Sequence, residues 1–364
     1  MRINYICVIL AILFFIPNRA RPSADDIALP DGFKIEEYAG GLDNPRFMAI
    51  SPDGVLFTAD MGDGAVIALP DKNGDGKADS VNKFISGLKR PNSIAFHGGY
   101  IYVGETDRVV RFKYEGADMP HGKKEVLISG LPKKGHFTKT LGFGPDGKMY
   151  VSMGSSCNIC VEEDKRRATV MRYNPDGTGE EIYASGLRNS VGLIWHPKTG
   201  ELWATDNGRD WLGDNLPPDE VNIVKEGKNY GWPYCYGDKI PDPDFDDAKK
   251  CADTVAPVVE LQAHSAPLGL TFYEGAMFPP DYKGDLFVAY HGSWNRTVPT
   301  GYKVVRVIMK EGKPLEIQDF TSGWLEGNKR SGRPVDVLVG NQGEVYISDD
   351  FTGSVYRVTY DNKH

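Results

Sequence analysis

Arginine, histidine and asparagine recur just before six short apolar runs of this chain. With their polar neighbours they are Asp43, Asn44 and Arg46; Lys89, Arg90 and Asn92; His136 and Lys139; Arg188 and Asn189; His264 and Ser265; and Arg333. Several guanidinium groups around one site favour an anion with more than one carboxylate or phosphate, because arginine binds such groups through two hydrogen bonds. A neutral histidine among them could serve as a general base.

A second set of polar and aromatic residues follows the partner runs. It comprises Asp206, Asn207, Gly208, Arg209, His291, Ser293, Trp294 and Arg296. A single arginine in such a place commonly forms a structural salt bridge, but cations at equivalent positions of several copies favour a binding site. Trp294 could stack on a ring-shaped ligand, although aromatic residues commonly pack in the core.

The acidic segment before residue 80 has the spacing of a calcium-binding loop. Oxygen ligands occupy loop positions one, three, five and nine, at Asp71, Asn73, Asp75 and Asp79. Gly76 follows at the sharp turn, but Asn82 replaces the bidentate glutamate of an EF-hand loop. We predict a structural calcium site here, with a solvated acidic turn as the alternative.

Four cysteines lie beyond the N-terminal segment. An even number in an exported protein favours two disulfides, which we predict as Cys157 with Cys160 and Cys235 with Cys251. A zinc site made from the four cysteines and a redox-active Cys-x-x-Cys are the alternatives.

The N-terminus has the features of a secretory signal. Arg2 precedes an apolar stretch from Tyr5 to Pro17 that is too short to span a bilayer comfortably. Cleavage near Ala20 or Ala24 predicts a signal peptide over residues 1–24, secretion to a bacterial periplasm, and no membrane insertion of the mature chain. An uncleaved anchor is the alternative.

The charge of the chain excludes some partners. The formal net charge is −8, and loss of three arginines with the signal makes it about −11. Nucleic acid and anionic membranes are therefore not expected as partners.

Six copies of one pattern position the polar residues. Each copy has an apolar run, a turn of the Pro-Asp-Gly type and a second apolar run, and the copies begin near Leu42, Leu88, Gly135, Leu187, Ser265 and Gly332. The runs are short and rich in β-branched and aromatic residues, which indicates antiparallel strands. Repeats of about 40–50 residues with three or four strands each are typical of a β-propeller.

We therefore predict an all-β fold, a six-bladed β-propeller of four-stranded antiparallel blades, with residues 25–364 as one domain. The stretch from Phe33 to Tyr38 has no turn partner of its own and is expected to complete the last blade. A sandwich of unrelated hairpins is the alternative. Because the first strand of each blade lines the channel of a propeller, the polar residues before these strands are expected at one mouth of the channel.

Four motifs carry a resemblance to a known family. They are Gly135-His136 with Leu141 to Val151; Gly186 to Asn189 with Gly192-Leu193; Asp219 to Asn222; and Asn229 to Pro233. In this order they resemble the pyrroloquinoline quinone (PQQ)-dependent soluble sugar dehydrogenases, the glucose/sorbosone dehydrogenase family with its aldose sugar dehydrogenases. The likeness extends from about Leu29 to Tyr360.

The resemblance implies a propeller that holds PQQ over its channel mouth and oxidises an aldose or related sugar. His136 would take the proton from the sugar C1 hydroxyl while hydride passes to the quinone. Arg188 would contact the quinone oxygens, and Asn189 would help to hold the cofactor. Electrons would then pass to a cytochrome or a membrane quinone.

The resemblance also implies a calcium ion beside the cofactor. Main-chain carbonyls of Gly208 and Arg209 would bind this ion, and Arg333 would pair with a cofactor carboxylate. The chain departs from the family's glucose oxidisers at three places. Arg209 replaces a proline, Val335 replaces a second arginine, and a lysine of the fifth blade has no clean counterpart, with Asn295 and Arg296 competing for its place. Arg46, Arg90 and Arg296 are candidates to supply the missing cation, and Trp294 is a candidate to stack on the cofactor.

Two functions of other classes are open at this point. A calcium-dependent lactonase or esterase would use acidic and asparagine side chains as metal ligands in the channel. A non-catalytic propeller would bind a glycan or a protein, since the fold alone does not imply catalysis. The polar set before the first strands is richer in arginine and histidine than in acids, which favours the dehydrogenase.

Overall fold

The computed structural model of this protein describes residues 24–361. The predicted signal peptide therefore lies outside the described residues, apart from Ala24, which begins the 3₁₀ helix η1 (Ala24–Asp26). Within the described residues the single α-helix, α1 (Ala248–Cys251), has one turn. No helix in this part of the chain combines the length and the apolar character needed to cross a membrane.

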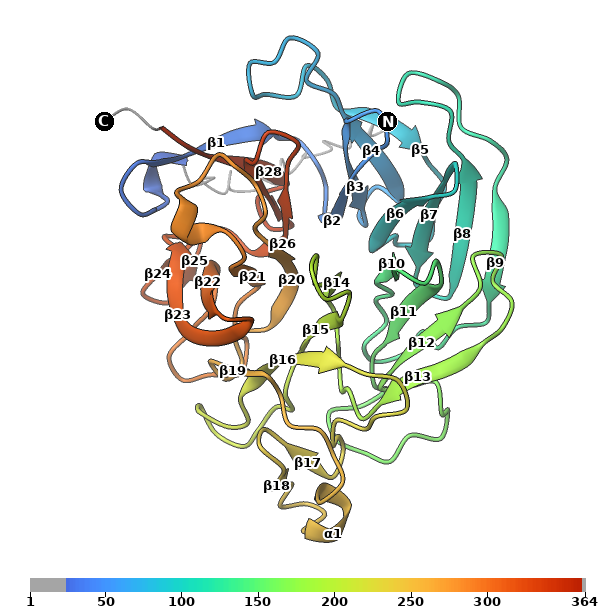
Figure 1. The fold of residues 1–364 in the computed structure, drawn as a ribbon, viewed down its shortest axis with the longest axis vertical. Helices are drawn as coiled ribbons and strands as arrows, with labels where there is room; N and C mark the ends of the chain where they lie inside the picture. Colours follow the sequence, from blue (N-terminus) through green and yellow to red (C-terminus); the bar gives the residue numbers. More distant parts are fainter. Residues whose placement is uncertain (1–23, 362–364) are drawn as a thin grey trace, which may run out of the picture.

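Six four-stranded antiparallel sheets form a ring of blades (Figure 1). Blades 1 to 3 are β2 (Pro45–Ile50), β3 (Leu56–Asp60), β4 (Ala65–Leu69) and β5 (Asn82–Ile85); β6 (Ser93–His97), β7 (Tyr100–Glu105), β8 (Arg108–Lys113) and β9 (Glu125–Ser129); and β10 (Leu141–Phe143), β11 (Met149–Met153), β12 (Thr169–Tyr173) and β13 (Glu181–Ser185). Blades 4 and 5 are β14 (Leu193–Trp195), β15 (Leu202–Asp206), β16 (Asp219–Val224) and β19 (Val259–Leu261); and β20 (Pro267–Phe272), β21 (Leu286–Tyr290), β22 (Lys303–Lys310) and β23 (Lys313–Thr321). The predicted six-bladed, all-β propeller is confirmed.

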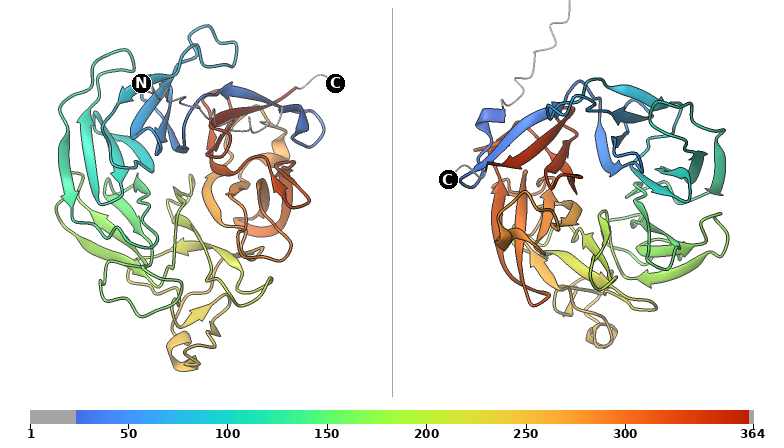
Figure 2. Two further views of the ribbon diagram at one scale, coloured as in Figure 1. Left: turned by 180° about the vertical axis from the view of Figure 1, so that it is seen from behind. Right: turned by 45° about the horizontal axis from the view of Figure 1, so that its top comes forward.

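Both ends of the chain build blade 6. Its strands are β26 (Pro334–Val339), β27 (Val345–Asp349), β28 (Ser354–Tyr360) and, at the outer edge, β1 (Phe33–Ala39). β1 pairs with β28 from Phe33 opposite Tyr360 to Ala39 opposite Val355. Figure 2 shows the blue N-terminal strand beside the red C-terminal strands. The N-terminal strand thus closes the ring, as its lack of a turn partner predicts.

Glycine turns separate the first and second strands of several blades. In blade 1, Ser51 N donates to Val55 O at 2.9 Å across the turn. Gly54 and Gly147 close two such turns with φ of 86° and 73°, a region that glycine enters without a steric penalty. The recurring Pro-Asp-Gly signal of the sequence therefore marks true strand boundaries.

The hydrophobic core lies between neighbouring blades. Phe57 and Val66 of blade 1 pack with Ile94 and Val103 of blade 2 in one buried cluster. The second strands of blades 1, 3, 4, 5 and 6 are buried along their length, and that of blade 2 is buried after Tyr100, because other blades cover both faces. The innermost strands neighbour one another in ring order, β2, β6, β10, β14, β20 and β26. The loops before them therefore emerge at one end of the ring.

Blade 4 carries an insertion between β16 and β19. It contains β17 (Cys235–Tyr236), β18 (Ile240–Pro241) and α1, which project from the ring at the bottom of Figure 1. The Cys235–Cys251 disulfide ties β17 to α1. The remaining short elements are η2 (Pro280–Tyr282), β24 (Leu325–Glu326) and β25 (Lys329–Arg330).

Candidate functional site

His136 and Arg188 meet at the mouth of the ring, in the loops before blades 3 and 4. Ser155, which follows β11, joins the two loops through its main chain. Its N donates to Arg188 O at 2.8 Å, and its O accepts from His136 N at 2.9 Å. The two residues that the sequence assigns to catalysis are therefore held on either side of one serine.

The imidazole of His136 has the properties of a general base. Burial, together with the positive charges of Arg188 and Arg167, lowers its pKa to about 3, while a hydrogen bond from Ser155 opposes the shift. The ring Nδ1 lies 2.9 Å from Ser155 Oγ. The imidazole is therefore neutral near pH 7 and keeps one nitrogen lone pair that can accept a proton.

Arg188 is buried, and four contacts fix its guanidinium. Nε donates to Asn158 O at 2.9 Å, and Nη2 donates to Asn158 Oδ1 at 2.9 Å. Nη1 donates to Asn207 O at 3.1 Å, and Asp210 Oδ2 lies 3.4 Å from Nη2. The charge of Arg188 is thus oriented by neutral oxygens and by one carboxylate at the limit of hydrogen bonding.

Asp206 fixes the main chain of the Arg188 loop by accepting two of its amide hydrogen bonds. Its Oδ2 accepts from Arg188 N at 2.9 Å, and its Oδ1 accepts from Asn189 N at 2.6 Å. Burial raises the pKa of Asp206 well above its usual range, the charge of Glu220 adds to the shift, and the two amides oppose it. Asn189 Nδ2 donates to Asn207 Oδ1 at 3.2 Å, which fixes its amide in turn.

A second cationic group lies between blades 5, 6 and 1. Arg333 Nε donates to His291 O at 3.1 Å, and its Nη2 donates to Gly292 O at 3.4 Å. Asp350 accepts from His291 Nε2 at 2.9 Å and from Arg46 Nη1 at 2.6 Å. Burial lowers the pKa of His291 to about 4, with Arg333 and Arg46 adding and Asp350 opposing. The ring of His291 is therefore neutral at pH 7, whereas both arginines carry charge.

Three predicted cofactor residues lie at the rim. The guanidinium of Arg90, an exposed residue, sits 3.9 Å above the ring of Phe137. Arg296 donates to two main-chain carbonyls at 3.2 Å. Trp294 is 67% exposed, and its ring meets the 70% exposed Trp211 edge to face, with centroids 6.2 Å apart. Arg90 and Trp294 are therefore exposed and Arg296 is half-buried, whereas Arg46 and Arg188 are buried and Arg333 is half-buried.

Two residues near the mouth differ from the sequence-based expectation. Lys139 is fully buried instead of lining the mouth, and its Nζ donates to Phe137 O at 2.9 Å. Burial lowers the pKa of Lys139 to about 7, with Arg167 adding to the shift. Val335, where the resemblance implies an arginine, packs in a buried apolar cluster with Phe47, Val191 and Leu268. Val335 therefore contributes an apolar contact between innermost strands, where an arginine would have contributed a positive charge.

The acidic loop of blade 1 binds its own main chain. Asp71 accepts from Gly74 N at 2.8 Å and from Gly76 N at 3.0 Å. Among the described residues, the one group of three His, Cys, Asp or Glu ligand atoms that lie within 4.8 Å of one another is Cys157, Cys160 and Glu162. Asp71, Asp75 and Asp79 therefore do not converge in this structure, and the calcium site stays a prediction.

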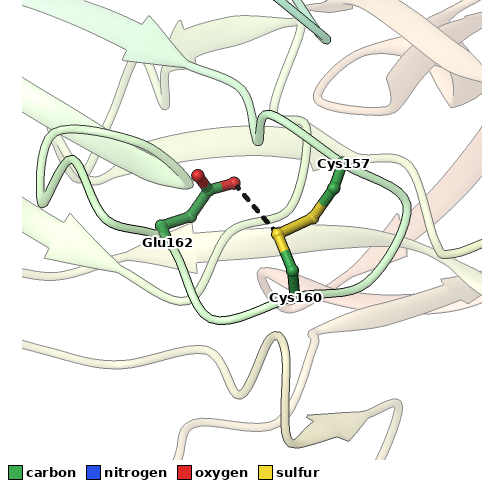
Figure 3. Close-up of side chains that lie close together, drawn as sticks. All are labelled: Cys157, Cys160 and Glu162. Carbon is green, nitrogen blue, oxygen red and sulfur yellow. Dashed lines mark hydrogen bonds between the residues drawn. A yellow bond between two sulfur atoms is a disulfide. The ribbon is translucent and has the colours of Figure 1, made fainter.

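Both predicted disulfides are present. Cys157 is bonded to Cys160, and Cys235 is bonded to Cys251. Figure 3 shows the first of these with the carboxylate of Glu162, whose Oε1 lies 4.0 Å from Cys160 Sγ. Because the four sulfurs form two separate bridges, a zinc site made from them is excluded.

A family model described as TrAA12-like matches residues 27–361. The chain belongs to the TrAA12-like family. An uncharacterized protein of Borreliella burgdorferi is 32% identical over 356 residues, which cover 92% of this chain and 91% of that protein. The pyrroloquinoline quinone-dependent pyranose dehydrogenase of Coprinopsis cinerea is 26% identical over 398 residues, with 90% of this chain and 53% of the enzyme covered. The chain thus spans about half the length of that fungal enzyme.

The fold of this TrAA12-like chain is shared with a solved PQQ domain. The holo form of the pyranose dehydrogenase PQQ domain from Coprinopsis cinerea superposes with a TM-score of 0.80 at 23% identity, and covers 94% of this chain and 99% of that domain. The resemblance to PQQ-dependent sugar dehydrogenases that the four motifs predict is confirmed by the family model and by the PQQ-dependent pyranose dehydrogenase relative.

The donor groups of this TrAA12-like site suit an anionic cofactor and a cation. Arg333 forms no salt bridge with any carboxylate in the described part of the chain, although it is charged. The main-chain oxygens of Gly208 and Arg209 accept no hydrogen bond from the residues that the structure describes. A Cβ at Gly208 would lie 2.8 Å from Pro218 O, so glycine is required for this close approach.

Sequence reasoning missed three residues of the site. Ser155 and Asn158 contact His136 and Arg188, and Asp350 pairs with Arg46. A signal for two of them was present, because Ser155 and Asp350 follow second strands as Asn207 and His291 do. Asn158 lies between the paired cysteines, but its role depends on contacts with a different blade that spacing does not reveal.

Proposed function

We propose that this protein oxidises the C1 hydroxyl of an aldose or a related pyranose with PQQ as the oxidant. The family and its PQQ-dependent sugar dehydrogenase relatives support the cofactor and the substrate class. The observation that carries the proposal is the pairing of a neutral, half-buried His136 with the buried charge of Arg188 at one mouth of the ring. A binding propeller has no need of a base with a depressed pKa beside a fixed cation.

Different residues of the chain have different roles in this reaction. His136 accepts the hydroxyl proton of the sugar on its unprotonated ring nitrogen, and Arg188 and Asn189 orient the cofactor oxygens. Arg333, which forms no salt bridge with a carboxylate among residues 24–361, binds a cofactor carboxylate. When bound, PQQ supplies a two-electron acceptor and calcium supplies a Lewis acid. The carbonyls of Gly208 and Arg209 hold that calcium ion.

The remaining predicted residues serve the edges of the site. Arg46 keeps positive charge near Arg333 while its own pairing with Asp350 anchors it. Arg90 and Arg296 add positive charge at the rim, and Trp294 with Trp211 offers an aromatic edge on which a ligand ring can stack. A sugar presents an apolar face of the kind that such rings bind.

Export and a second calcium ion complete the proposal. The predicted signal places the protein in a periplasm, where a cytochrome or a membrane quinone takes the electrons. The Asp71, Asn73, Asp75 and Asp79 loop holds a structural calcium ion in blade 1, apart from the cofactor.

The decisive experiment is a titration of the mature protein after chelator treatment. PQQ is added with and without calcium while the quinone absorbance is followed, and a panel of aldoses is then added. We expect calcium-dependent binding followed by aldose-driven bleaching. If PQQ does not bind in the presence of calcium, the protein is not a PQQ enzyme and a glycan-binding or lactonase role takes precedence.

A further inference from the structure

The loop after β11 contacts both residues to which we assign the chemistry. We define residues 155–162 as the disulfide loop, because the Cys157–Cys160 bond closes it (Figure 3). We propose that the disulfide loop is the positioning element of the site, in which Ser155 sets the proton on His136 and Asn158 fixes the guanidinium of Arg188. The catalytic meaning of this inference rests on the proposed function, but the two contacts can be tested without it.

Ser155 determines which ring nitrogen of His136 carries the proton. The hydroxyl of Ser155 donates to Cys157 O at 2.7 Å, and this proton is committed because a carbonyl can only accept. Toward His136 Nδ1, at 2.9 Å, the same oxygen can therefore only accept. Nδ1 must carry the ring proton, so Nε2 is left with the lone pair that a base requires. The side chain of Ser155 is fully buried, so water does not replace either partner.

Asn158 holds Arg188 with both its side chain and its main chain. Its main-chain O accepts from Arg188 Nε at 2.9 Å, and its Oδ1 accepts from Arg188 Nη2 at 2.9 Å. The same Oδ1 accepts from Asp210 N at 2.8 Å, while Asn158 Nδ2 donates to Asp210 O at 3.1 Å. Three of these four contacts fix the side-chain amide of Asn158 between two blades, and the fourth fixes its main-chain oxygen. The planar guanidinium can therefore rotate only if Asn158 moves with it.

The disulfide and Glu162 fix the acceptors that these contacts use. Both acceptor carbonyls belong to Cys157 and Asn158, inside the ring that the disulfide closes. Glu162 braces the start of the loop, since its carboxylate accepts from Ser156 N at 2.6 Å and from Ser156 Oγ at 2.7 Å. The half-buried sulfurs make no other covalent link in the described structure. The disulfide therefore holds the geometry of two side chains outside the loop.

Gly154, just before the disulfide loop, packs so closely against His136 that a larger side chain does not fit there. A Cβ at Gly154 would lie 2.4 Å from His136 Cβ and 2.7 Å from Asn189 Oδ1. The loop therefore approaches both predicted site residues as closely as backbone allows. A change in the path of the disulfide loop must displace them.

The tautomer of His136 provides a direct test on the protein without cofactor. Histidine-labelled ¹⁵N spectra identify His136 by comparison with His136→Asn. We expect the parent to show a protonated Nδ1 and a bare Nε2, and Ser155→Ala to show a mixture in which Nε2 is protonated. Thr199→Ala is the control, because it removes an exposed hydroxyl that binds Glu201 outside the disulfide loop and should leave the tautomer unchanged. An unchanged tautomer in Ser155→Ala overturns the assignment.

The loaded enzyme gives a second readout of Ser155. We expect kcat of Ser155→Ala to fall by about 10- to 100-fold, as general-base catalysis is worth at least that much, while KM changes by less than about threefold. If KM rises while kcat is kept, Ser155 acts on substrate binding and the positioning role is wrong.

Removal of the disulfide tests the role of the loop as a whole. We expect Cys157→Ser/Cys160→Ser to lose the single tautomer of His136 and to bind PQQ at least about tenfold more weakly, because Arg188 is no longer fixed. Asn158→Ala should weaken PQQ binding without altering the tautomer. Cys235→Ser/Cys251→Ser, which breaks the bridge in the blade 4 insertion, should leave the tautomer unchanged.

The outcomes separate this inference from the proposed function. If the parent does not bind PQQ but Ser155→Ala changes the tautomer, the positioning contact stands and the PQQ function fails. If PQQ binds and the loop variants keep both the tautomer and the affinity of the parent, the PQQ function stands and the positioning role of the disulfide loop is wrong.

Discussion

Arg46 and Asp350 form a buried ion pair that joins the first blade to the last. Arg46 Nη1 lies 2.6 Å from Asp350 Oδ2, and the two side chains are 8% and 10% exposed. Arg46 belongs to β2, and Asp350 directly follows β27, so the pair adds an ionic contact near the axis to the pairing of β1 with β28 at the edge. Closure of the ring and the charge of the site therefore share one carboxylate.

Replacement of Asp350 by asparagine tests this shared role. Asp350→Asn should lower the free energy of unfolding by about 3 kcal/mol at pH 7, because Arg46 keeps a buried charge without a counter-charge. Burial raises the pKa of Asp350, but His291, Arg46 and Arg333 lower it below its usual range. This stabilisation is therefore present above the unfolded pKa and is lost as the pH falls through the folded value.

Urea unfolding at pH 7 measures the effect of Asp350→Asn. Asp118→Asn is the control, because it breaks an exposed pair with Lys72 and should leave the unfolding midpoint unchanged. Equal midpoints for parent and Asp350→Asn would show that the ion pair contributes nothing to ring closure.

His136→Asn should separate binding from turnover. Asparagine keeps a polar side chain near Ser155 but has no basic nitrogen, so we expect PQQ affinity within about threefold of the parent and kcat reduced by at least about 100-fold. PQQ titration and sugar-dependent bleaching measure the two effects. A variant that oxidises sugar as fast as the parent would falsify the assignment of the base.

The pH dependence of the reaction follows from the same imidazole. Burial, with Arg188 and Arg167, lowers the pKa of His136 from the ordinary 6.5 to about 3. We expect kcat/KM to show no loss of the base between pH 8 and pH 5. A loss of kcat/KM at acid pH with an apparent pKa near 6.5 would place the base at a residue other than His136.

The depressed pKa of His136 also makes the free energy of unfolding depend on pH. Between pH 6.5 and pH 3 the unfolded chain binds a proton that the folded chain does not, so this contribution is present above pH 6.5 and is lost as the pH falls. The free energy of unfolding should therefore fall more between pH 7 and pH 4 in the parent than in His136→Asn. Denaturant unfolding at both pH values measures the difference.

The sequence predicted the fold well because propeller blades are local. Apart from β1, which completes blade 6, and the insertion in blade 4, the strands of each blade follow one another along the chain. The apolar runs, the glycine turns and the unpartnered stretch from Phe33 to Tyr38 were therefore enough to give six blades and their closure. The two disulfides followed from an even number of cysteines in an exported chain.

The site was less predictable because partner choice is not local. Lys139 and Arg188 precede equivalent strands, yet Lys139 is buried against carbonyls of its own loop, whereas Arg188 is fixed by Asn158. Val335 takes an apolar environment that only the ring as a whole creates, with neighbours from blades 1, 4 and 5. Spacing therefore located the mouth but did not tell which cations face it.

Arg333 is the residue whose loss should affect the cofactor first. Its guanidinium is held by the carbonyls of His291 and Gly292 and has no carboxylate partner among residues 24–361. We expect Arg333→Ala to weaken PQQ binding by about 100-fold, in line with a charged hydrogen bond worth about 2–3 kcal/mol. Arg333→Lys keeps the charge but not the two-pronged geometry, and should recover part of this loss.

Direct titration of PQQ measures both Arg333 variants. Arg111→Ala is the control, because Arg111 on β8 pairs with Glu125 of β9, away from the innermost strands, and should leave PQQ affinity unchanged. Equal affinity of the parent and Arg333→Ala would remove Arg333 from the cofactor site.

The acidic loop of blade 1 should make stability depend on calcium. Asp71 accepts from Gly74 N and Gly76 N, Asp75 accepts from Lys77 N and Asp79 accepts from Lys72 N, so a bound ion shares these carboxylates with main-chain amides. Calcium at about 100 times its dissociation constant would add about 2.7 kcal/mol to the free energy of unfolding. We expect Asp75→Ala to lose the part of the calcium-dependent rise in Tm that belongs to this loop, while PQQ binding with calcium is kept.

Asp253→Asn, which changes an exposed carboxylate outside the loop, is the control. If calcium raises the Tm of Asp75→Ala as much as that of the parent, the loop is a solvated acidic turn and its hydrogen bonds are its whole role.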